Sequence, residues 1–276
     1  MSIQRRVQEL VQRRSFVPGV VDAALSGQGR SVADLTVGIT GASAGIGREA
    51  ARQLAARGAR VIGVARNEQA LESLADEVGC DYRVCDLSDE VAVVALIDEL
   101  AGERIDVLVN NAGHSIRRTI VSSTDRFHDY QRTMRLNYLA AVQLSLGLLP
   151  GMIERGGGQF VNVCTWALHA NTFPRFSAYA ASKSALAIFG RSLNAERPDG
   201  VCATNVYFPL VRTEMIAPTA EYDDVGALDV DEAARWLLRA ITHQPEEVSP
   251  AVVRYLLPLV DFVSPRMSDR TIAAIT

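Results

Sequence analysis

Short apolar runs alternate with longer segments of helical periodicity along the chain, and this rhythm constrains the fold more than any other feature. Apolar runs without a polar face predict strands that are buried on both sides of a sheet. The expected strands are Thr36 to Thr40, Arg60 to Ala65, Tyr82 to Cys85, Ile105 to Asn110, Gln159 to Thr165 and Val201 to Phe208. The helices between them are expected to begin near Gly45, Asn67, Ser88, Ser123 and Ser177.

Parallel strands that are joined by crossover helices wind in a single hand. The alternation therefore predicts an α/β fold, a single-domain doubly wound parallel sheet of the Rossmann type with helices on both faces. Ligands of such sheets bind at the carboxyl ends of the strands. The motifs described below all fall at such ends, so we expect them to meet at one crevice.

The overall charge argues against a broad nucleic-acid surface. The chain has 276 residues, of which 48% are hydrophobic and 22% charged, with a formal charge of -4. Nucleic-acid binding normally needs an extended basic surface. The pairs Arg5-Arg6, Arg13-Arg14 and Arg117-Arg118 are sufficient for single phosphates, so phosphorylated small molecules remain candidate partners.

The cysteines and the N-terminus indicate a compartment. Cys80, Cys85, Cys164 and Cys202 show no C-x-x-C spacing, and the four histidines form no ligand motif, so we expect free buried thiols and no metal. The first ten residues lack a secretory signal, and no run reaches the roughly 18 unbroken apolar residues of a spanning helix. We therefore expect a cytoplasmic protein without a transmembrane segment.

Two apolar stripes lie near the ends of the chain. The first consists of Ile3, Val7, Leu10 and Val11, and the second of Val252, Val253, Leu256, Leu257, Val260 and Val263. Core packing or a subunit contact is the expected role of both stripes. Peripheral membrane contact is the alternative for Ala251 to Val263, although Pro258 is expected to interrupt that helix and basic residues are sparse there.

A glycine-rich turn joins the first strand to its helix. The segment from Thr40 to Gly47 has the spacing Gly-x-x-x-Gly-x-Gly, and a second strand, Val61 to Ala65, follows at the distance that a nucleotide-binding unit requires. Glycines let the backbone approach a pyrophosphate, and the helix N-terminus offers unpaired N–H groups with partial positive charge. A tight turn without a ligand is the alternative. The context favours dinucleotide binding.

The end of the second strand indicates which dinucleotide is bound. Enzymes that use NAD usually place a carboxylate there for the adenosine ribose, whereas this chain has Ala65 followed by Arg66. An arginine favours a 2′-phosphate, so we expect NADP(H) in preference to NAD(H). Ser43 and Arg48 are expected to assist Arg66; a surface arginine without a ligand is the alternative.

Lys183 is the only lysine of the chain, and it follows Tyr179 by four residues, which places both side chains on one helix face. A compact ammonium can hydrogen-bond a ribose and favour a neighbouring tyrosinate, and arginine does this less well. The pair predicts a proton-donating tyrosine. The alternative is an uncoupled tyrosine and lysine on a solvated face.

Further motifs occur in a fixed order along the chain. They are Thr40-Gly41-x-x-x-Gly45-Ile46-Gly47, Asp86-Leu87, Asn110-Asn111-Ala112-Gly113, Asn137, the strand Val161 to Thr165, and Tyr179-x-x-x-Lys183. With these motifs the chain resembles the short-chain dehydrogenases/reductases from about Leu35 to about Thr219. The resemblance implies a dinucleotide-binding catalytic domain over residues 35–250, an N-terminal extension over 1–34 that is expected to be helical, and a C-terminal helical segment over 251–276.

The resemblance also implies roles for individual residues. Tyr179, Lys183, Thr165 and Asn137 are the expected catalytic residues: proton donor, ribose-binding ammonium, carbonyl-orienting hydroxyl and proton relay. The expected cofactor-binding residues are Gly41, Ser43, Gly45, Ile46, Gly47, Arg66, Asp86, Leu87, Asn111, Ala112, Gly113, Tyr179, Lys183, Pro209, Val211 and Thr213. No metal ligands are expected.

Two departures from the family pattern concern the substrate side. The carbonyl-orienting residue is usually a serine 13 positions before the tyrosine, where this chain has Trp166. We therefore assign the hydroxyl to Thr165, one residue earlier, with Cys164 as a weaker alternative donor. In the segment Pro209-Leu210-Val211-Arg212-Thr213, many relatives have glycine after the proline. Thr213 is still expected to reach the nicotinamide carboxamide.

A narrower resemblance, from about Asn110 to Thr219, is to the bacterial fatty acyl-CoA reductases of this superfamily. The similar segments are Asn110 to Arg118, Asp125 to Tyr130, Arg175 to Tyr179 and Pro209 to Thr219. This resemblance implies reduction of a long-chain acyl thioester to an aldehyde. Arg117, Arg118 and Arg212 are candidates for contact with the phosphates or carboxylates of such a substrate, with surface or helix-capping roles as the alternative.

Other readings remain open at this point. One is a ketoreductase or alcohol dehydrogenase that acts on a β-keto thioester, a polyketide-like compound or another hydrophobic ketone; another is a non-catalytic NADP(H) sensor. The helix from Ser177 to Asn194 carries more apolar surface than one sheet face covers, so we expect a homodimer or homotetramer. The sequence does not specify the physiological substrate, the direction of the reaction or its stereochemistry.

Overall fold

The computed structural model describes residues 29–170, 172–196, 198–215, 226–266, 269 and 272. Its centre is one seven-stranded sheet with the order β3-β2-β1-β4-β5-β6-β7, and every neighbouring pair of strands is parallel. The strands are β1 (Thr36–Thr40), β2 (Arg60–Ala65), β3 (Asp81–Val84), β4 (Val107–Asn110), β5 (Gly158–Thr165), β6 (Val201–Phe208) and β7 (Glu247–Val248). The predicted doubly wound parallel sheet is confirmed.

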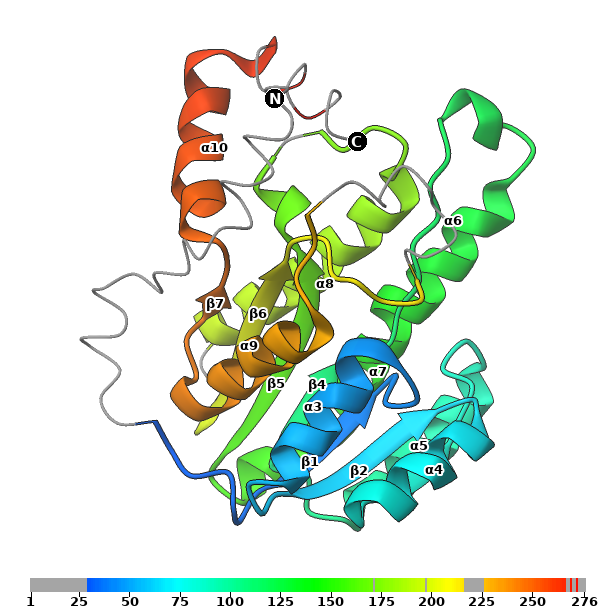
Figure 1. Ribbon diagram of the computed structural model, residues 1–276, viewed down its shortest axis with the longest axis vertical. Helices are drawn as coiled ribbons and strands as arrows, with labels where there is room; N and C mark the ends of the chain where they lie inside the picture. Colours follow the sequence, from blue (N-terminus) through cyan, green and yellow to red (C-terminus); the bar gives the residue numbers. More distant parts are fainter. Residues whose placement is uncertain are drawn as a thin grey trace.

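Helices cover both faces of this sheet, with α3 and α9 in front of it in the view of Figure 1. The long helices are α3 (Gly45–Ala55), α4 (Glu68–Val78), α5 (Glu90–Ala101), α6 (Phe127–Met134), α7 (Ala140–Glu154), α8 (Ser177–Glu196), α9 (Val230–His243) and α10 (Ala251–Val263). Three short turns of helix complete the described part: η1 (Val121–Ser123), the π-helical η2 (Arg135–Leu139) and η3 (Trp166–His169).

Alternation along the strands divides the core into two layers. In β2, Val61 belongs to the apolar cluster that includes residues of α3, α4 and α9, whereas its neighbour Ile62 belongs to the cluster that includes residues of α5, α7 and α8. Successive side chains of a strand point to opposite faces, so a strand with apolar residues at both kinds of position must be covered on both sides. The near-continuous apolar runs of the sequence are therefore the cause of the two-layered core.

A ladder of asparagines crosses the buried centre of the sheet. Asn110 donates to the Oδ1 of Asn162 at 2.9 Å, Asn162 donates to the Oδ1 of Asn205 at 3.0 Å, and Asn205 donates to the carbonyl of Ala187 at 2.9 Å. Buried amides are stable only when they are hydrogen-bonded. Gly190 of α8 lies against this ladder, where a Cβ would come within 2.5 Å of the Asn205 Oδ1. The ladder thus fixes how closely α8 approaches the sheet.

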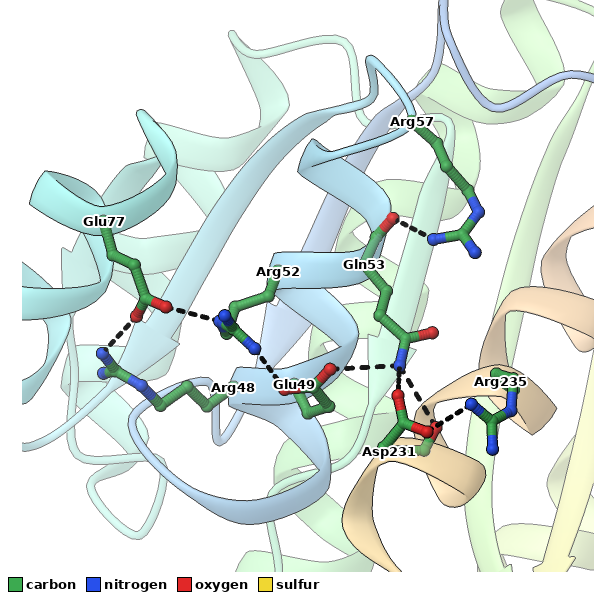
Figure 2. Close-up of polar contacts among 8 residues, drawn as sticks. All are labelled: Arg48, Glu49, Arg52, Gln53, Arg57, Glu77, Asp231 and Arg235. Atoms are coloured by element: carbon green, nitrogen blue, oxygen red, sulfur yellow. Dashed lines mark hydrogen bonds and ion pairs between the residues drawn. The ribbon is translucent and has the colours of Figure 1, made fainter.

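Polar contacts fasten α3 to the helices on either side of it (Figure 2). Arg48 and Arg52 both bind Glu77 of α4, with Arg48 at 2.8 Å, and Gln53 donates to Asp231 of α9 at 2.9 Å. These contacts are exposed to solvent, so each contributes little to stability. Arg48 therefore holds α3 against α4, and it does not line the cavity described below. This differs from the expectation that Arg48 assists Arg66 in binding a 2′-phosphate.

Several element boundaries differ from those expected. The helix expected near Ser123 begins as the single turn η1 and becomes α6 only at Phe127, because residues 121–126 form a separate turn that is closed by a bond from the N–H of Arg126 to the carbonyl of Ser123. The short strand β7 and the amphipathic helix α9 were not predicted. Strand β7 pairs with β6, and α9 packs against α3. These partners are distant in sequence, so local periodicity gave only weak signals for β7 and α9.

The C-terminal helix corrects one expectation. Pro258 does not interrupt α10, which continues to Val263. A proline removes one backbone hydrogen bond of a helix, and here the ladder resumes, with Ser264 donating to the carbonyl of Val260 at 2.8 Å. The expected stripe residues Val252, Val253, Leu256 and Leu257 lie outside the described side chains, and residues 1–28, with the first stripe, lie outside the described residues.

One helical stretch of the described residues, Phe127–Glu154, is long and apolar enough to cross a membrane by length and composition alone, and 39% of its most apolar window is buried. Core helices of folded domains pass the same test. Leu144, Leu148 and Met152 of this stretch pack into the layer between α5 and the sheet. Packing on the sheet therefore accounts for the buried part of the stretch.

The cysteines are free thiols. Cys80, Cys85 and Cys164 are buried as expected, whereas Cys202 is only partly buried. Burial raises the pKa of Cys85 to about 11 and that of Cys164 to about 12. Thiols with such pKa values are unreactive near neutrality. No group of three or more candidate metal ligands occurs among the residues that the structure describes.

Candidate active site

A cavity of about 960 Å³ opens at the carboxyl ends of the strands. Residues at or just after the ends of β2, β3, β4, β5 and β6 all line it: Ala65, Cys85, Asn111, Thr165 and Phe208. This is the crevice in which open parallel sheets bind their ligands. The segments far apart in sequence that carried the motifs therefore do meet at one place.

The glycine-rich turn forms one wall of the cavity and needs its glycines for different reasons. Gly41 and Gly45 have φ angles of +70° and +54°, which residues with a Cβ adopt only at a cost. Gly47 instead needs space, because a Cβ there would collide with the carbonyl oxygen of Gly41 and come within 2.6 Å of the Asn111 Nδ2. Gly41, Ser43, Gly45 and Ile46 line the cavity, whereas Gly47 lies beneath the turn.

The start of α3 leaves backbone donors available at this wall. Its N-cap, Ala44, makes no side-chain capping bond, and no acidic residue occupies the first turn. By contrast, Asn67 and Asp89 cap α4 and α5, each by accepting from a first-turn N–H. Uncapped N–H groups that face a cavity form an anion site. The turn therefore fits the pyrophosphate of a dinucleotide.

Arg66 lies at the mouth of the cavity beside Ser43 and Asn67. Its side chain is 72% exposed, and its closest described ion-pair partner, Asp86, is 3.9 Å away. A guanidinium so loosely held can turn toward a phosphate at low cost. Asn67 was not predicted; it also caps α4, which is a sufficient structural reason for its presence.

Asp86 and Leu87, the expected adenine contacts, are placed differently. Leu87 lines the cavity, whereas Asp86 lies beside the rim and accepts hydrogen bonds from the backbone N–H and the hydroxyl of Ser88 at 2.9 and 2.6 Å. The bonds from Ser88 lower the pKa of Asp86, so this carboxylate is charged at neutral pH. Its contact with an adenine stays a prediction.

Tyr179 and Lys183 both line the cavity from the first turns of α8. Lys183 is only 3% exposed, and its Nζ donates to the carbonyl of Val163 in β5 at 2.7 Å. Burial lowers the pKa of this ammonium. A poorly hydrated ammonium interacts strongly with a developing negative charge nearby, which suits it to favour the phenolate form of Tyr179.

Asn137 does not line the cavity but lies directly beneath it. Its Oδ1 accepts from the N–H of His114 at 2.9 Å, and its Nδ2 donates to the carbonyl of His114 at 2.9 Å and to the hydroxyl of Ser182 at 3.0 Å. Asn137 belongs to the π-helical turn η2, a feature that often occurs at functional sites. Its side chain ties the loop after β4 to α8; the expected relay through a water stays a prediction.

Gly113 explains why that loop can approach the catalytic helix. A Cβ on this residue would lie 3.0 Å from the Oδ1 of Asn137 and 3.3 Å from the Nζ of Lys183. Asn111, Ala112 and Gly113 all line the cavity. The loop backbone therefore borders the position of the Lys183 ammonium.

Thr165, at the end of β5, lines the cavity and is the N-cap of η3, where its Oγ1 accepts from the N–H of Ala167 at 3.5 Å. The hydroxyl hydrogen is not used in that bond and can be donated toward a substrate. The alternative donor, Cys164, also borders the cavity, but its thiol points to the carbonyl of Lys183 at 4.0 Å. The geometry favours Thr165.

Aromatic and aliphatic side chains form an apolar wall of the cavity, and the sequence analysis did not assign them to the site. They are Leu136, Trp166, Phe173, Phe176, Leu210 and Met215. Phe173 and Phe176 stack at 4.8 Å, and Phe176 meets Tyr179 edge-on at 6.4 Å. The clustering of aromatics just before Tyr179 was the available signal. This wall suits an apolar substrate.

The segment after β6 closes the cavity over the glycine-rich turn. Pro209, Val211 and Thr213 line it, and the Thr213 methyl would lie 3.2 Å from a Cβ on Gly45. Arg212 points away and pairs with Asp229 at 3.8 Å. Thr213 is therefore near the turn, and its contact with a carboxamide stays a prediction.

Comparisons with known proteins agree with this geometry. The model of the short chain dehydrogenase family matches residues 35–224. A fatty acyl-CoA reductase of Mycobacterium tuberculosis is 43% identical over 236 residues, which are 83% of this chain and 80% of the relative. A fatty acyl-CoA reductase of Acinetobacter baylyi is 45% identical over 219 residues, 76% of this chain and 74% of that enzyme.

The fold comparison agrees as well. A structure described as an NAD(P)-dependent gluconate 5-dehydrogenase from Beutenbergia cavernae with bound NADP superposes with a TM-score of 0.70 at 26% identity, covering 82% of this chain and 93% of the other. Both the sequence match and the arrangement of the glycine-rich turn, tyrosine and lysine around one cavity lead to the same family. The chain belongs to the short-chain dehydrogenases/reductases and is an oxidoreductase that uses a nicotinamide cofactor.

Proposed function

We propose that the protein reduces a long-chain acyl-CoA thioester to the corresponding aldehyde with NADP(H). The observation that carries the proposal is one cavity that Tyr179 and Lys183 line together with the glycine-rich turn and a group of aromatic side chains. The turn suits a pyrophosphate and the wall suits an apolar acyl chain. The names of the two similar reductases support the substrate class.

The proposed chemistry assigns one task to each side chain. The nicotinamide cofactor supplies a hydride to the thioester carbonyl carbon. Tyr179 then donates its phenolic proton to the oxygen, which carries the developing negative charge, and Thr165 donates a hydrogen bond to the same oxygen. The Lys183 ammonium stabilises the resulting tyrosinate.

The product of that step is a hemithioacetal, which collapses to the aldehyde. Its C–S bond breaks, the C=O bond re-forms, and the hydroxyl proton passes to the departing thiolate. The balance is one acyl thioester, one reduced cofactor and one proton consumed for one aldehyde, one thiol and one oxidised cofactor. Asn137 is proposed to order the water that returns a proton to Tyr179.

The proposed preference for NADP(H) rests on Arg66. Its exposed side chain lines the cavity, as does Ser43, and the end of β2 offers no carboxylate for a ribose. The structurally similar dehydrogenase with bound NADP is consistent with this choice. A bidentate arginine–phosphate contact adds both affinity and geometric selectivity.

A thiol-release assay tests the proposed reaction. Protein, NADPH and palmitoyl-CoA are incubated with a thiol-reactive dye, and thiol release is compared with NADPH oxidation. We expect equal amounts of both. NADPH oxidation with a β-keto thioester but no thiol release from palmitoyl-CoA would instead favour the ketoreductase alternative, and NADPH binding without reduction of any substrate would favour the sensor.

We also propose a homodimer or homotetramer. Leu139, Leu146 and Ile153 recur at intervals of seven along η2 and α7 and are exposed, as is Ile188 of α8. Such a stripe on neighbouring helices is typical of a subunit contact. Sedimentation at micromolar concentration is expected to give at least a dimer, and Leu146→Glu is expected to weaken that dimer. A wild-type monomer would contradict the proposal.

The proposed compartment of the protein is the cytoplasm, which cell fractionation can test.

A further inference from the structure

A single buried carboxylate gathers several cations beside the cavity. Asp129 of α6 has a side chain that is 3% exposed, and it lies 3.4 Å from Arg118, 3.3 Å from Arg126 and 3.0 Å from Arg132. His128 is a fourth neighbour at 3.3 Å. We refer to Arg118, Arg126 and Arg132, held by Asp129, as the arginine collar.

The collar carries more positive charge than its carboxylate can balance. One carboxylate has two oxygens, whereas three guanidiniums have fifteen N–H donors. Residues 117–132 contain four arginines and two aspartates, in a chain whose formal charge is -4. Burial opposes ionisation of Asp129, but the bond from Arg126 and the neighbouring cations outweigh it and lower its pKa. The collar therefore keeps a net positive charge at neutral pH.

The free donors of the collar face outward. The side chain of Arg132 is 61% exposed, and those of Arg126 and Arg118 are more than one-third exposed. Asp129 is buried, so it orients the guanidiniums from below while their remaining N–H groups stay available.

The collar is fixed to the rim of the catalytic cavity. Arg117, the residue before Arg118, lines the cavity. The N–H of Arg118 donates to the carbonyl of Arg175 at 2.6 Å, and Tyr130 of α6 shares a 2.6 Å hydrogen bond with Ser177 at the start of α8. Arg175 and Ser177 directly precede Tyr179. The rim that carries the collar is thus joined to the helix that carries the proposed proton donor.

We propose that the arginine collar binds the phosphate groups of the coenzyme A part of the substrate. This inference rests on the proposed function and names the residues that would distinguish a coenzyme A thioester from other thioesters. Guanidinium forks match phosphate oxygens bidentately. Phosphates bound at the rim leave the flexible arm of the thioester free to enter the cavity, where Tyr179 and Thr165 lie.

Kinetics with two thioesters of the same acyl chain test the inference. Arg126→Gln/Arg132→Gln is compared with the wild type on palmitoyl-CoA and on palmitoyl-N-acetylcysteamine, which lacks the phosphates, with NADPH saturating. We expect the KM for palmitoyl-CoA to rise about tenfold, because two charge-assisted but part-exposed contacts are lost. The kcat, and the KM for the short thioester, are expected to stay within about twofold.

Arg235→Gln is the matched control. Arg235 is an exposed arginine of α9 that pairs with Asp231 and Glu232, four and three residues before it. Arg126 and Arg132 each pair with Asp129, three residues away, so the control removes an arginine with a similar local ion pair. We expect it to leave both KM values unchanged. An equal rise of both KM values in the collar variant, or an unchanged KM for palmitoyl-CoA, would overturn the inference. A KM that rises only when palmitoyl-acyl carrier protein is the substrate would also overturn the inference.

A binding measurement separates this inference from the proposed reaction. Coenzyme A is titrated calorimetrically into the protein saturated with NADP+, and the collar variant is expected to bind it about tenfold more weakly, with a smaller salt dependence. If coenzyme A binds in this way but no thioester is reduced, the proposed function fails and the collar stands. If thioesters are reduced while coenzyme A binding is the same in both proteins, only the collar is wrong.

Discussion

The two sides of the cavity are built in different ways. The cofactor side is mostly backbone: the glycine-rich turn, the uncapped start of α3 and the loop at Gly113 present N–H groups and close approaches rather than side chains. The substrate side is mostly side chains, from Leu136, the residues around Thr165, the aromatics before Tyr179, Leu210 and Met215. The first side depends on φ angles and space, the second on which distant segments come together.

This difference teaches where each kind of change should act. A backbone site tolerates almost no added atom, because its neighbours are main chain and cannot move aside. A side-chain site tolerates substitution in its packing but loses its chemistry when one functional group is removed. The following predictions test that contrast, beginning with the largest expected effect.

Tyr179→Phe removes one oxygen from the substrate side and leaves the cofactor side intact. We expect turnover to fall by about 10²–10⁴, the range for loss of a general acid, while NADPH binding stays within about threefold of the wild type. Steady-state rates and fluorescence titration of NADPH check both parts. Retained turnover would remove the proton-donor role from Tyr179, and lost NADPH binding would mean that the two sides are not separable.

Gly47→Ala adds one methyl group to the cofactor side, where it would meet the Gly41 carbonyl and the Asn111 amide. We expect a loss of about 1–3 kcal/mol in the free energy of unfolding, together with weaker NADPH binding. Gly102→Ala is the matched control: that glycine caps α5 with a φ of -72°, and a Cβ there would meet its nearest neighbour at 3.6 Å. Denaturant unfolding checks both variants, and equal stabilities would contradict the idea of a backbone-built site.

Arg66→Ala tests a cofactor contact that is assigned to a side chain. We expect the KM for NADPH to rise about tenfold and that for NADH to change by less than about twofold, because the guanidinium contributes only when a 2′-phosphate is present. Initial rates with each cofactor measure the two constants. A similar change for both cofactors, or a wild-type preference for NADH, would show the assignment to be wrong.

A further prediction concerns His169, which ends the helical turn η3 that begins after Thr165. Its Nε2 lies 2.8 Å from the hydroxyl of Ser249, its ring packs on Tyr207 at 4.6 Å, and burial lowers its pKa to about 4. Glu247 of β7 opposes that shift, whereas Arg191 of α8 and Arg254 of α10 add to it. As the pH falls from about 6.5 toward 4, the unfolded chain takes up a proton that the folded chain refuses, so stability declines.

We expect that decline to be on the order of 1–2 kcal/mol for His169, reduced by solvent at its part-exposed ring. His169→Gln keeps a polar partner for Ser249 and removes the titration. Denaturant unfolding at pH 7.5 and 5 is therefore expected to show a smaller pH dependence in the variant. The same pH dependence in both proteins would mean that His169 is protonated in the folded state.

The contrast between the two sides also explains how far the sequence alone could lead. The glycine-rich turn, the strands that flank it and the tyrosine–lysine pair are local patterns, each with its own physical cause within a few residues, and the structure brings them to one cavity. Phe173 and Met215 line the site, and the arginine collar lies next to Arg117 at its rim, only because loops between distant elements pack together. Arg48 was misassigned for the same reason: its partner, Glu77, lies 29 residues away.

The boundaries that were missed follow the same rule. Helix α9 begins after Asp229 and packs on α3, so its apolar face has meaning only in the folded protein. Pro258 looked like a helix end because a local rule for proline was applied to a helix whose remaining hydrogen bonds are sufficient. Many segments of the chain each indicate the fold class, whereas a contact between two distant residues is indicated by those two residues alone.

The most direct test of the account follows the hydride itself. The protein is incubated with palmitoyl-CoA and NADPH that carries deuterium at both C4 positions, and the aldehyde is trapped and analysed by mass spectrometry. We expect one deuterium on the aldehyde carbon, one thiol released for each cofactor oxidised, and neither with Tyr179→Phe. An unlabelled aldehyde, or no reduction of any acyl thioester by the wild-type protein, would contradict the account.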